Sequence, residues 1–166
     1  MNHSVLSIGL FMFMHMGIAG AQVPHIIGSW KLNNGASIYP GPVPRSQVRT
    51  YFPLDDGFLL GIAVTIDAQG NGNFLQFTAK TDGLDYPEYD AFSLAHLQMS
   101  GVSTSATYSE TPLDEYTVEW VDKDGGEPSF SGTRHVSEDG DTLTIVFERH
   151  NPEGQPESYK LVYDRQ

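Results

Sequence analysis

The sequence predicts an all-β protein, a single antiparallel β-barrel of eight to ten strands. Short runs in which apolar and polar residues alternate recur at a spacing of roughly ten residues, with turn-forming clusters between them. No long stretch shows helical periodicity. This spacing is typical of a closed barrel or a β-sandwich. We favour the barrel because closure removes the exposed strand edges that a long meander would present.

The C-terminal third, residues 131–164, shows the pattern most clearly. Two turn clusters, at 138–141 and 151–154, separate three alternating runs. Apolar residues share one face in the middle run and one face in the last run: Leu143, Ile145, Phe147, Tyr159, Leu161 and Tyr163. Because successive side chains of a strand point to opposite faces, these runs predict a meander of three antiparallel strands.

Four strands are expected in the first half of the barrel, at 26–33, 47–54, 58–67 and 74–81. Three prolines between residues 40 and 44 predict an extended loop after the first strand, because proline cannot donate to a ladder. In 58–67 five apolar residues share one face. Gly61, Ala63 and Thr65 share the other face, which we expect to be crowded or lightly covered. A turn rich in glycine and asparagine joins this run to 74–81.

The middle of the chain is less regular. Segment 89–99 fits either a strand or a helix, and we predict a strand. Segment 100–111 is polar and partly strand-like, whereas 115–121 is a clear strand. A glycine turn then leads into 130–136, which joins the C-terminal meander.

Residues 1–21 have the features of a secretory signal peptide. A run of apolar residues from Val5 to Ile18 is followed by the small triplet Ala19-Gly20-Ala21. The run is too short to span a bilayer comfortably, so we expect cleavage before Gln22 and a single domain at 22–166. The alternatives are an uncleaved anchor or a buried helix, since the segment begins without Lys or Arg. No cysteine follows the run, which excludes a lipoprotein anchor. The mature protein is therefore expected to be secreted or periplasmic, without a stable membrane anchor.

The composition excludes several classes of partner and of chemistry. The net charge is -12, with 9 Lys and Arg against 21 Asp and Glu, so a nucleic-acid partner or an anionic lipid surface is disfavoured. There are no cysteines, which excludes disulfides, a thiolate nucleophile and cysteine-ligated metals. The histidines lack metal-ligand spacing and no glycine-rich phosphate loop precedes a helix. We expect no metal and no cofactor.

An ordered set of short motifs resembles one family. The set comprises Gly28-Ser29-Trp30-Lys31-Leu32-Asn33, the loop 40–47, the segment 78–87, Gly132-Thr133-Arg134, the turn 139–144 and Val162-Tyr163-Asp164. In this order they resemble the small secreted bacterial lipocalin-like proteins of the calycin group, most of which are uncharacterised. The resemblance implies a barrel whose floor is plugged by Trp30 beside Gly28, with a late arginine packed on the indole. Arg134, Arg149 and Arg165 are all candidates for that arginine.

Aromatic residues are abundant enough to line an internal pocket. A barrel of this size has room for one small ligand, and aromatic walls with a few polar groups are typical of pockets for apolar molecules. We expect such a ligand to contact Tyr51, Phe77, Tyr89, Trp120, Arg134, Phe147 and Tyr159. The first hypothesis is therefore a barrel that binds a small hydrophobic molecule without transforming it. The alternative for the same rings is a dry, filled core, as in a structural or protein-interaction module.

An enzyme on the same barrel is the second hypothesis. Some calycin relatives isomerise, cyclise or decarboxylate small molecules, so the resemblance leaves an isomerase, cyclase or lyase open. The candidate catalytic residues are Arg134, His135, Glu119 and Tyr159. Arg134 and His135 are neighbours on one strand and must face opposite ways. An inward Arg134 could bind a carboxylate, and an inward His135 could act as a general base. The hypothesis requires two of the four to converge on one point in the cavity.

The signal-peptide prediction is tested by the N-terminus of the exported protein. We expect mass spectrometry of material outside the cytoplasm to show a chain that begins at Gln22, because signal peptidase cleaves after the small triplet. An intact Met1 in that material would contradict the prediction.

Overall fold

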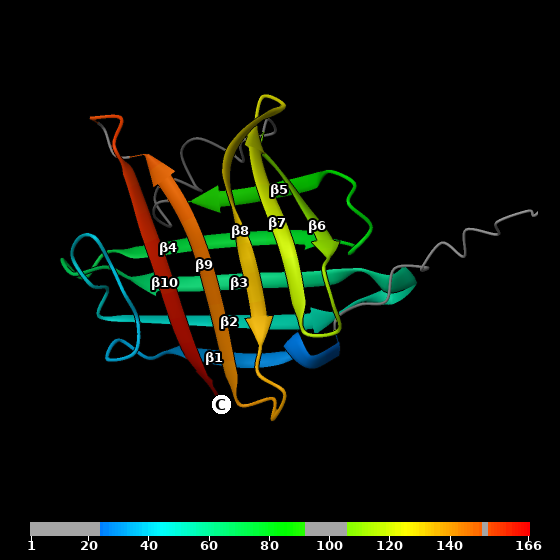
Figure 1. Ribbon diagram of the computed structural model, residues 1–166, viewed down its shortest axis with the longest axis horizontal. Helices are drawn as coiled ribbons and strands as arrows, with labels where there is room; N and C mark the ends of the chain where they lie inside the picture. Colours follow the sequence, from blue (N-terminus) through cyan, green and yellow to red (C-terminus); the bar gives the residue numbers. More distant parts are fainter. Residues whose placement is uncertain (1–23, 92–105, 151–152) are drawn as a thin grey trace, which may run out of the picture.

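The computed structural model describes residues 24–91, 106–150 and 153–166, and this part of the chain is almost entirely β-structure (Figure 1). Two short 3-10 helices, η1 and η2, span Pro24–Ile26 and Asp55–Gly57. The strands are β1 (Gly28–Leu32), β2 (Ser46–Pro53), β3 (Leu59–Ile66), β4 (Gly72–Ala79), β5 (Tyr86–Ala91), β6 (Ala106–Pro112), β7 (Thr117–Asp124), β8 (Glu127–Val136), β9 (Thr142–His150) and β10 (Pro156–Arg165).

The strands form one closed antiparallel barrel. Each pairs with its neighbour in the sequence from β1 to β10, and β10 pairs with β1 to complete the ring. In Figure 1 β1 to β5 run across the view and β6 to β10 cross them steeply, so the barrel is flattened into two crossed layers. The predicted fold class, a single antiparallel barrel of eight to ten strands, is confirmed.

The ambiguous segment 89–99 lies partly outside the described residues. The structure starts strand β5 earlier than expected, at Tyr86, and its last described residue is Ala91. In the described ranges β5 pairs with β6 at only two positions, Tyr86 with Tyr108 and Pro87 with Thr107. An ion pair also connects β7 with the residue that precedes β5. Lys123 Nζ on β7 lies 2.7 and 2.8 Å from the carboxylate oxygens of Asp85.

The floor of the barrel is built around Trp30, which is fully buried. Its indole N–H donates to the carbonyl of Ile26 at 2.8 Å, and the Arg165 guanidinium lies 4.1 Å from the centre of the ring. Arg165 also donates to the carbonyls of Ile27 and His25, at 2.8 and 2.7 Å. Of the three candidate arginines, Arg165 is therefore the one that packs on the floor tryptophan.

Gly28 makes the close approach of Arg165 possible. Its φ of 130° lies in a region that residues with a Cβ rarely adopt. A Cβ built there would lie 2.9 Å from Nη1 of Arg165. In the Gly-x-Trp motif, glycine is therefore needed for steric reasons, and tryptophan for packing.

The inward faces of β2 and β3 are not their most apolar faces. On β3 the inward residues are Leu59, Gly61 and Ala63, while Val64, one of the five apolar residues on the opposite face, is 46% exposed. The reason is the small volume that is available above β3 on the inner face of the sheet. Gly61 pairs with Tyr51 on one side and with Phe77 on the other, and a Cβ on Gly61 would lie 2.4 Å from the Phe77 ring. Large side chains from β2 and β4 meet above β3 and leave space for small residues only.

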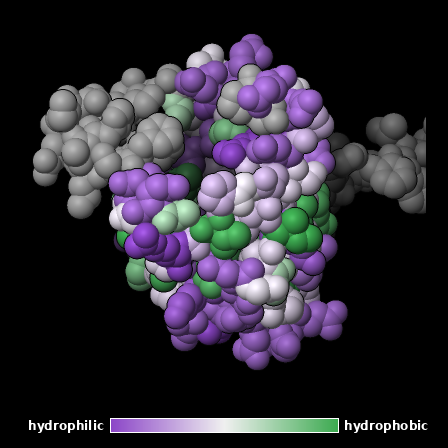
Figure 2. All heavy atoms as spheres, turned by 90° about the vertical axis from the view of Figure 1, so that its left-hand side faces the viewer, coloured by the Kyte–Doolittle hydropathy of each residue, from purple (hydrophilic) through white to green (hydrophobic). Residues whose placement is uncertain are grey.

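Apolar residues displaced to the outer face remain partly in solvent. Val48, Phe52 and Val64 are between 38% and 47% exposed. The face of the molecule in Figure 2 shows apolar side chains in separate patches among polar ones.

Substituting Gly61 with Ala tests this volume constraint. Phe77 is 2% exposed and stacked on Tyr108 at 4.1 Å, so its ring cannot move aside freely. We expect Gly61→Ala to lower the free energy of unfolding by about 1–3 kcal/mol, as overpacking does in other cores. Gly41→Ala is the matched control, because a Cβ at Gly41 meets nothing within 4 Å. Urea unfolding followed by circular dichroism measures both, and equal stability of the two variants would contradict the prediction.

Candidate ligand-binding cavity

The barrel interior contains a partly open cavity of about 240 Å³. Side chains from β2, β4, β5, β6, β7, β8 and β9 line it: Arg49, Tyr51, Leu75, Phe77, Glu88, Tyr108, Trp120, Asp122, Phe130, Arg134, Ile145, Phe147 and Arg149. Most of this wall is apolar or aromatic, and the polar groups are almost all charged. The interior is therefore not a dry, filled core.

Aromatic rings form a continuous row along the cavity wall. Phe77 is stacked on Tyr108 with ring centres 4.1 Å apart, and Tyr108 lies 6.2 Å from Trp120. Phe147 follows Trp120 at 5.9 Å, and Tyr159 is stacked on Phe147 at 4.7 Å with nearly parallel planes. Stacked and tilted pairs of this kind hold their rings in place. The row therefore gives the cavity a firm wall that an apolar or aromatic molecule can pack against.

A buried ion pair neutralises Arg134. Its guanidinium lies 2.6 Å from Oε1 of Glu110 and donates to Oε2 at 2.8 Å, and both side chains are at most 3% exposed. The Tyr108 hydroxyl donates to the same carboxylate at 2.8 Å. Two buried charges are tolerated only when they are paired and hydrogen-bonded. Arg134 faces the cavity as predicted, but Glu110 already occupies the carboxylate-binding edge that we assigned to a ligand.

A second interior arginine, Arg49, has no carboxylate partner among the described residues. Its Nε donates to the Tyr163 hydroxyl at 3.0 Å. That hydroxyl donates in turn to Oε1 of Gln47, whose amide nitrogen donates to Thr65 Oγ1 at 2.5 Å. This chain of hydrogen bonds fixes the direction in which the guanidinium points. Arg49 also lines two neighbouring spaces of about 250 and 400 Å³, so three cavities meet at this side chain.

Two phenol hydroxyls near Arg49 are buried without a hydrogen-bond partner in the described chain, those of Tyr39 and Tyr51. Tyr51 follows Arg49 by two residues on β2, so both point inward, and Tyr39 lines the 400 Å³ space with Arg49. A buried hydroxyl without a partner costs free energy. Tyr51 can donate to an acceptor in the 240 Å³ cavity, and Tyr39 to an acceptor in the adjoining 400 Å³ space.

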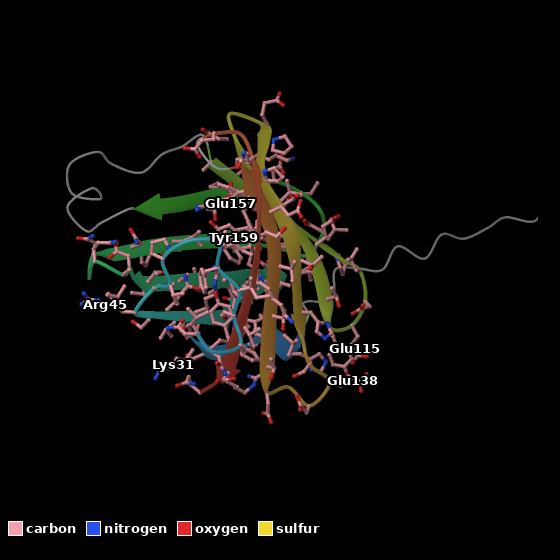
Figure 3. All side chains as sticks on the ribbon, turned by 60° about the vertical axis from the view of Figure 1, so that its left-hand side comes forward. Lys31, Arg45, Glu115, Glu138, Glu157 and Tyr159 are labelled. Atoms are coloured by element: carbon pink, nitrogen blue, oxygen red, sulfur yellow. The ribbon has the colours of Figure 1, made fainter. Side chains whose placement is uncertain are left out.

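The structure places the predicted contact residues as follows. Tyr51, Phe77, Trp120, Arg134 and Phe147 line the 240 Å³ cavity. Tyr159 lines the 400 Å³ space, and its hydroxyl donates to Oε2 of Glu157 at 3.0 Å (Figure 3). The side chain of Tyr89 lies outside the described residues.

Two catalytic candidates point away from the interior, which corrects their assignment. Glu119 lies between the inward residues Val118 and Trp120, and His135 between the inward residues Arg134 and Val136, so alternation turns both outward. His135 is exposed, and its Nδ1 lies 2.9 Å from Thr117 Oγ1. Neither can act on a molecule inside the barrel. The other two candidates, Arg134 and Tyr159, hydrogen-bond to Glu110 and Glu157 respectively and not to each other in the described part of the chain.

Sequence reasoning missed Arg49, Glu110 and Tyr39. Arg49 could have been found, because it shares the period-two face of Tyr51, which was predicted to be inward. Glu110 lies in a polar segment without a clear alternating pattern, and Tyr39 lies in the proline-rich loop. No local signal marks either of them as interior.

The described residues contain no cluster of three or more His, Asp or Glu side chains that could hold a metal ion. Within the same ranges no helix has the length and the apolar character needed to cross a membrane.

Comparisons with known proteins show the fold alone. No family model and no curated protein matches the sequence. Among solved structures, the wild-type fluorescent protein UnaG superposes with a TM-score of 0.52 at 11% identity, over 87% of this chain and 100% of UnaG. Rv2717c from M. tuberculosis superposes with a TM-score of 0.51 at 13% identity, over 87% of this chain and 94% of that one. The chain thus shares a lipocalin-like barrel fold with these structures. At these identities the likeness assigns no ligand.

The buried tyrosines make stability depend on alkaline pH. Burial raises the pKa of Tyr108 and the Glu110 carboxylate raises it further, and burial also raises the pKa of Tyr163. In the unfolded chain both phenols titrate near pH 10, so the unfolded state loses these protons first. The stability they contribute is complete below about pH 10 and is lost as the pH rises above it.

We therefore expect the free energy of unfolding to fall steadily between about pH 9.5 and about pH 11.5. The part of the tyrosinate absorbance near 295 nm that comes from Tyr108 and Tyr163 should rise only together with unfolding. Urea unfolding at a series of pH values measures the first effect and spectrophotometric titration the second. Stability that is constant across this pH range would contradict the prediction.

Proposed function

We propose that this protein binds a small, largely apolar molecule inside the barrel and does not transform it. The observation that carries the proposal is the 240 Å³ cavity inside the barrel, with its row of aromatic rings. Ligand pockets in proteins are typically concave, mostly apolar and provided with a few placed polar groups. We also propose that the protein acts outside the cytoplasm, after removal of residues 1–21.

The arrangement of charges favours binding over catalysis. A general acid or base must reach the substrate, and its proton must not already be committed to a neighbour. In this cavity Arg134, Glu110 and Tyr108 satisfy one another, and the two other charged or titratable candidates, Glu119 and His135, lie outside. The four residues that the sequence suggested as catalytic therefore do not converge on one point of the cavity.

Filling the cavity should abolish binding. Leu75 lines both the 240 and the 250 Å³ spaces, so a tryptophan there would occupy volume that a ligand needs. We expect Leu75→Trp to weaken binding of the neutral fluorescent probe N-phenylnaphthylamine by about tenfold or more. Fluorescence titration measures the affinity.

Gln76→Trp is the matched control, because Gln76 is the next residue on β4 and points to the outer face. It adds the same indole without entering the barrel and should leave the affinity unchanged. If the unmodified protein binds no probe, or if Leu75→Trp binds it as well as the control does, the proposed function is wrong.

A further inference from the structure

We propose that the natural ligand carries a carboxylate and that Arg49 on β2 binds it, with the hydroxyls of Tyr51 and Tyr39 as additional donors. This inference rests on the proposed function and assigns the chemical class of the ligand.

The first step is the inventory of interior arginines. Three line the 240 Å³ cavity, and two of them have carboxylate partners. Arg134 is paired with Glu110 at 2.6 Å, and Arg149 lies 3.5 Å from Glu157. Arg49 has no such partner in the described ranges. A guanidinium is charged at all physiological pH values, and Arg49 is half-buried, so a counter-charge beside it would be stabilising. A ligand anion would supply it.

The surroundings of Arg49 keep it charged. Burial lowers its pKa, but the phenols of Tyr163 and Tyr51 outweigh this effect and raise the pKa overall. Acidic residues that line the 240 Å³ cavity, Glu88 and Asp122, come from β5 and β7 and do not line the two other spaces that Arg49 borders. The acidic side chain that does border one of them, Asp67, accepts hydrogen bonds from Asn71.

The second step is the number of free donors. The Nε of Arg49 is used by Tyr163, so the guanidinium can offer its two terminal nitrogens. The unpartnered hydroxyls of Tyr51 and Tyr39 add two more donors. A carboxylate has two oxygens and accepts about four hydrogen bonds, often two of them from one arginine. The donors that the protein leaves unsatisfied therefore match what a carboxylate accepts.

The third step is preorganisation. Thr65, Gln47 and Tyr163 form a hydrogen-bond chain that ends at Nε of Arg49 and holds its guanidinium in place. An arginine held in this way loses little conformational entropy when it binds an anion. Because Arg49 borders all three spaces, a carboxylate bound to it leaves the rest of the ligand free to extend along the aromatic row.

Competition between matched compounds tests the inference. Naphthylacetic acid and naphthylethanol have the same ring and differ in carrying a carboxylate or a hydroxyl. Each is used to displace N-phenylnaphthylamine from the protein. We expect the acid to compete about tenfold to a hundredfold better than the alcohol, which is the usual worth of a charge-assisted hydrogen bond. Naphthyl phosphate, with a tetrahedral head group, is the third compound and should compete less well than the acid.

Single substitutions test whether Arg49 is the residue that causes the preference for the acid. Arg49→Gln should abolish the preference for the acid over the alcohol, measured as the ratio of their two affinities in the same variant. Arg45→Gln removes the same charge at the periphery of the barrel, where Arg45 is exposed, and should keep the preference (Figure 3). Tyr51→Phe removes only an unpartnered hydroxyl, so it should fold at least as well as the unmodified protein. It should reduce the preference about threefold to tenfold.

Each outcome decides between distinct conclusions. If the fluorescent probe does not bind at all, the proposed function fails. If the probe binds but acid and alcohol compete equally, the function stands and the carboxylate inference is wrong. Preference for naphthyl phosphate, or a preference for the acid that survives Arg49→Gln, would also overturn it. Should Arg49→Gln fail to fold, Tyr51→Phe decides, because an unchanged preference in that variant excludes the proposed donor set.

Discussion

The contact of Arg165 with Trp30 is the interaction on which the rest of the structure depends. Trp30 belongs to the first strand and Arg165 to the last. Their stacking therefore connects β1 and β10, the two strands whose pairing closes the barrel. The same guanidinium satisfies carbonyl groups of the segment that leads into β1. Closure removes both free edges of the sheet and creates the interior in which the cavity lies. Cavity, buried ion pair and unpaired arginine all exist because the ring is closed.

Inside the ring, volume decides which residues face inward. Across β2, β3 and β4 the inward side chains run large, small, large, with Gly61 between Tyr51 and Phe77 and Ala63 between Arg49 and Leu75. Rings from distant strands then meet over the small residues and form the aromatic row. These rings do not fill the interior, and the cavity lies beside them. A binding cavity and a well-packed wall are thus consequences of the same alternation in size.

Electrostatics distinguishes two arginines that line the same cavity. The Arg134–Glu110–Tyr108 cluster is internally satisfied and rigidifies the wall, since a buried pair of this kind is costly to break. Arg49, by contrast, is held by Tyr163 but has no counter-charge in the described residues, and two phenols nearby lack acceptors. A protein that leaves donors unsatisfied loses some stability at that place, which is typical of sites reserved for a ligand.

The sequence by itself determined the fold class, the antiparallel meander and the floor motif, because turn residues and period-two alternation are local properties. It also marked Tyr51, Phe77, Trp120 and Phe147 as candidates for an aromatic wall. Only the tertiary structure decided that Arg165 is the arginine on the floor, that β3 turns Gly61 inward, and that Glu110 rather than a ligand neutralises Arg134. Each of these depends on residues far apart in the chain. Whether an inward charge is paired or free follows from which strands the closed barrel brings face to face.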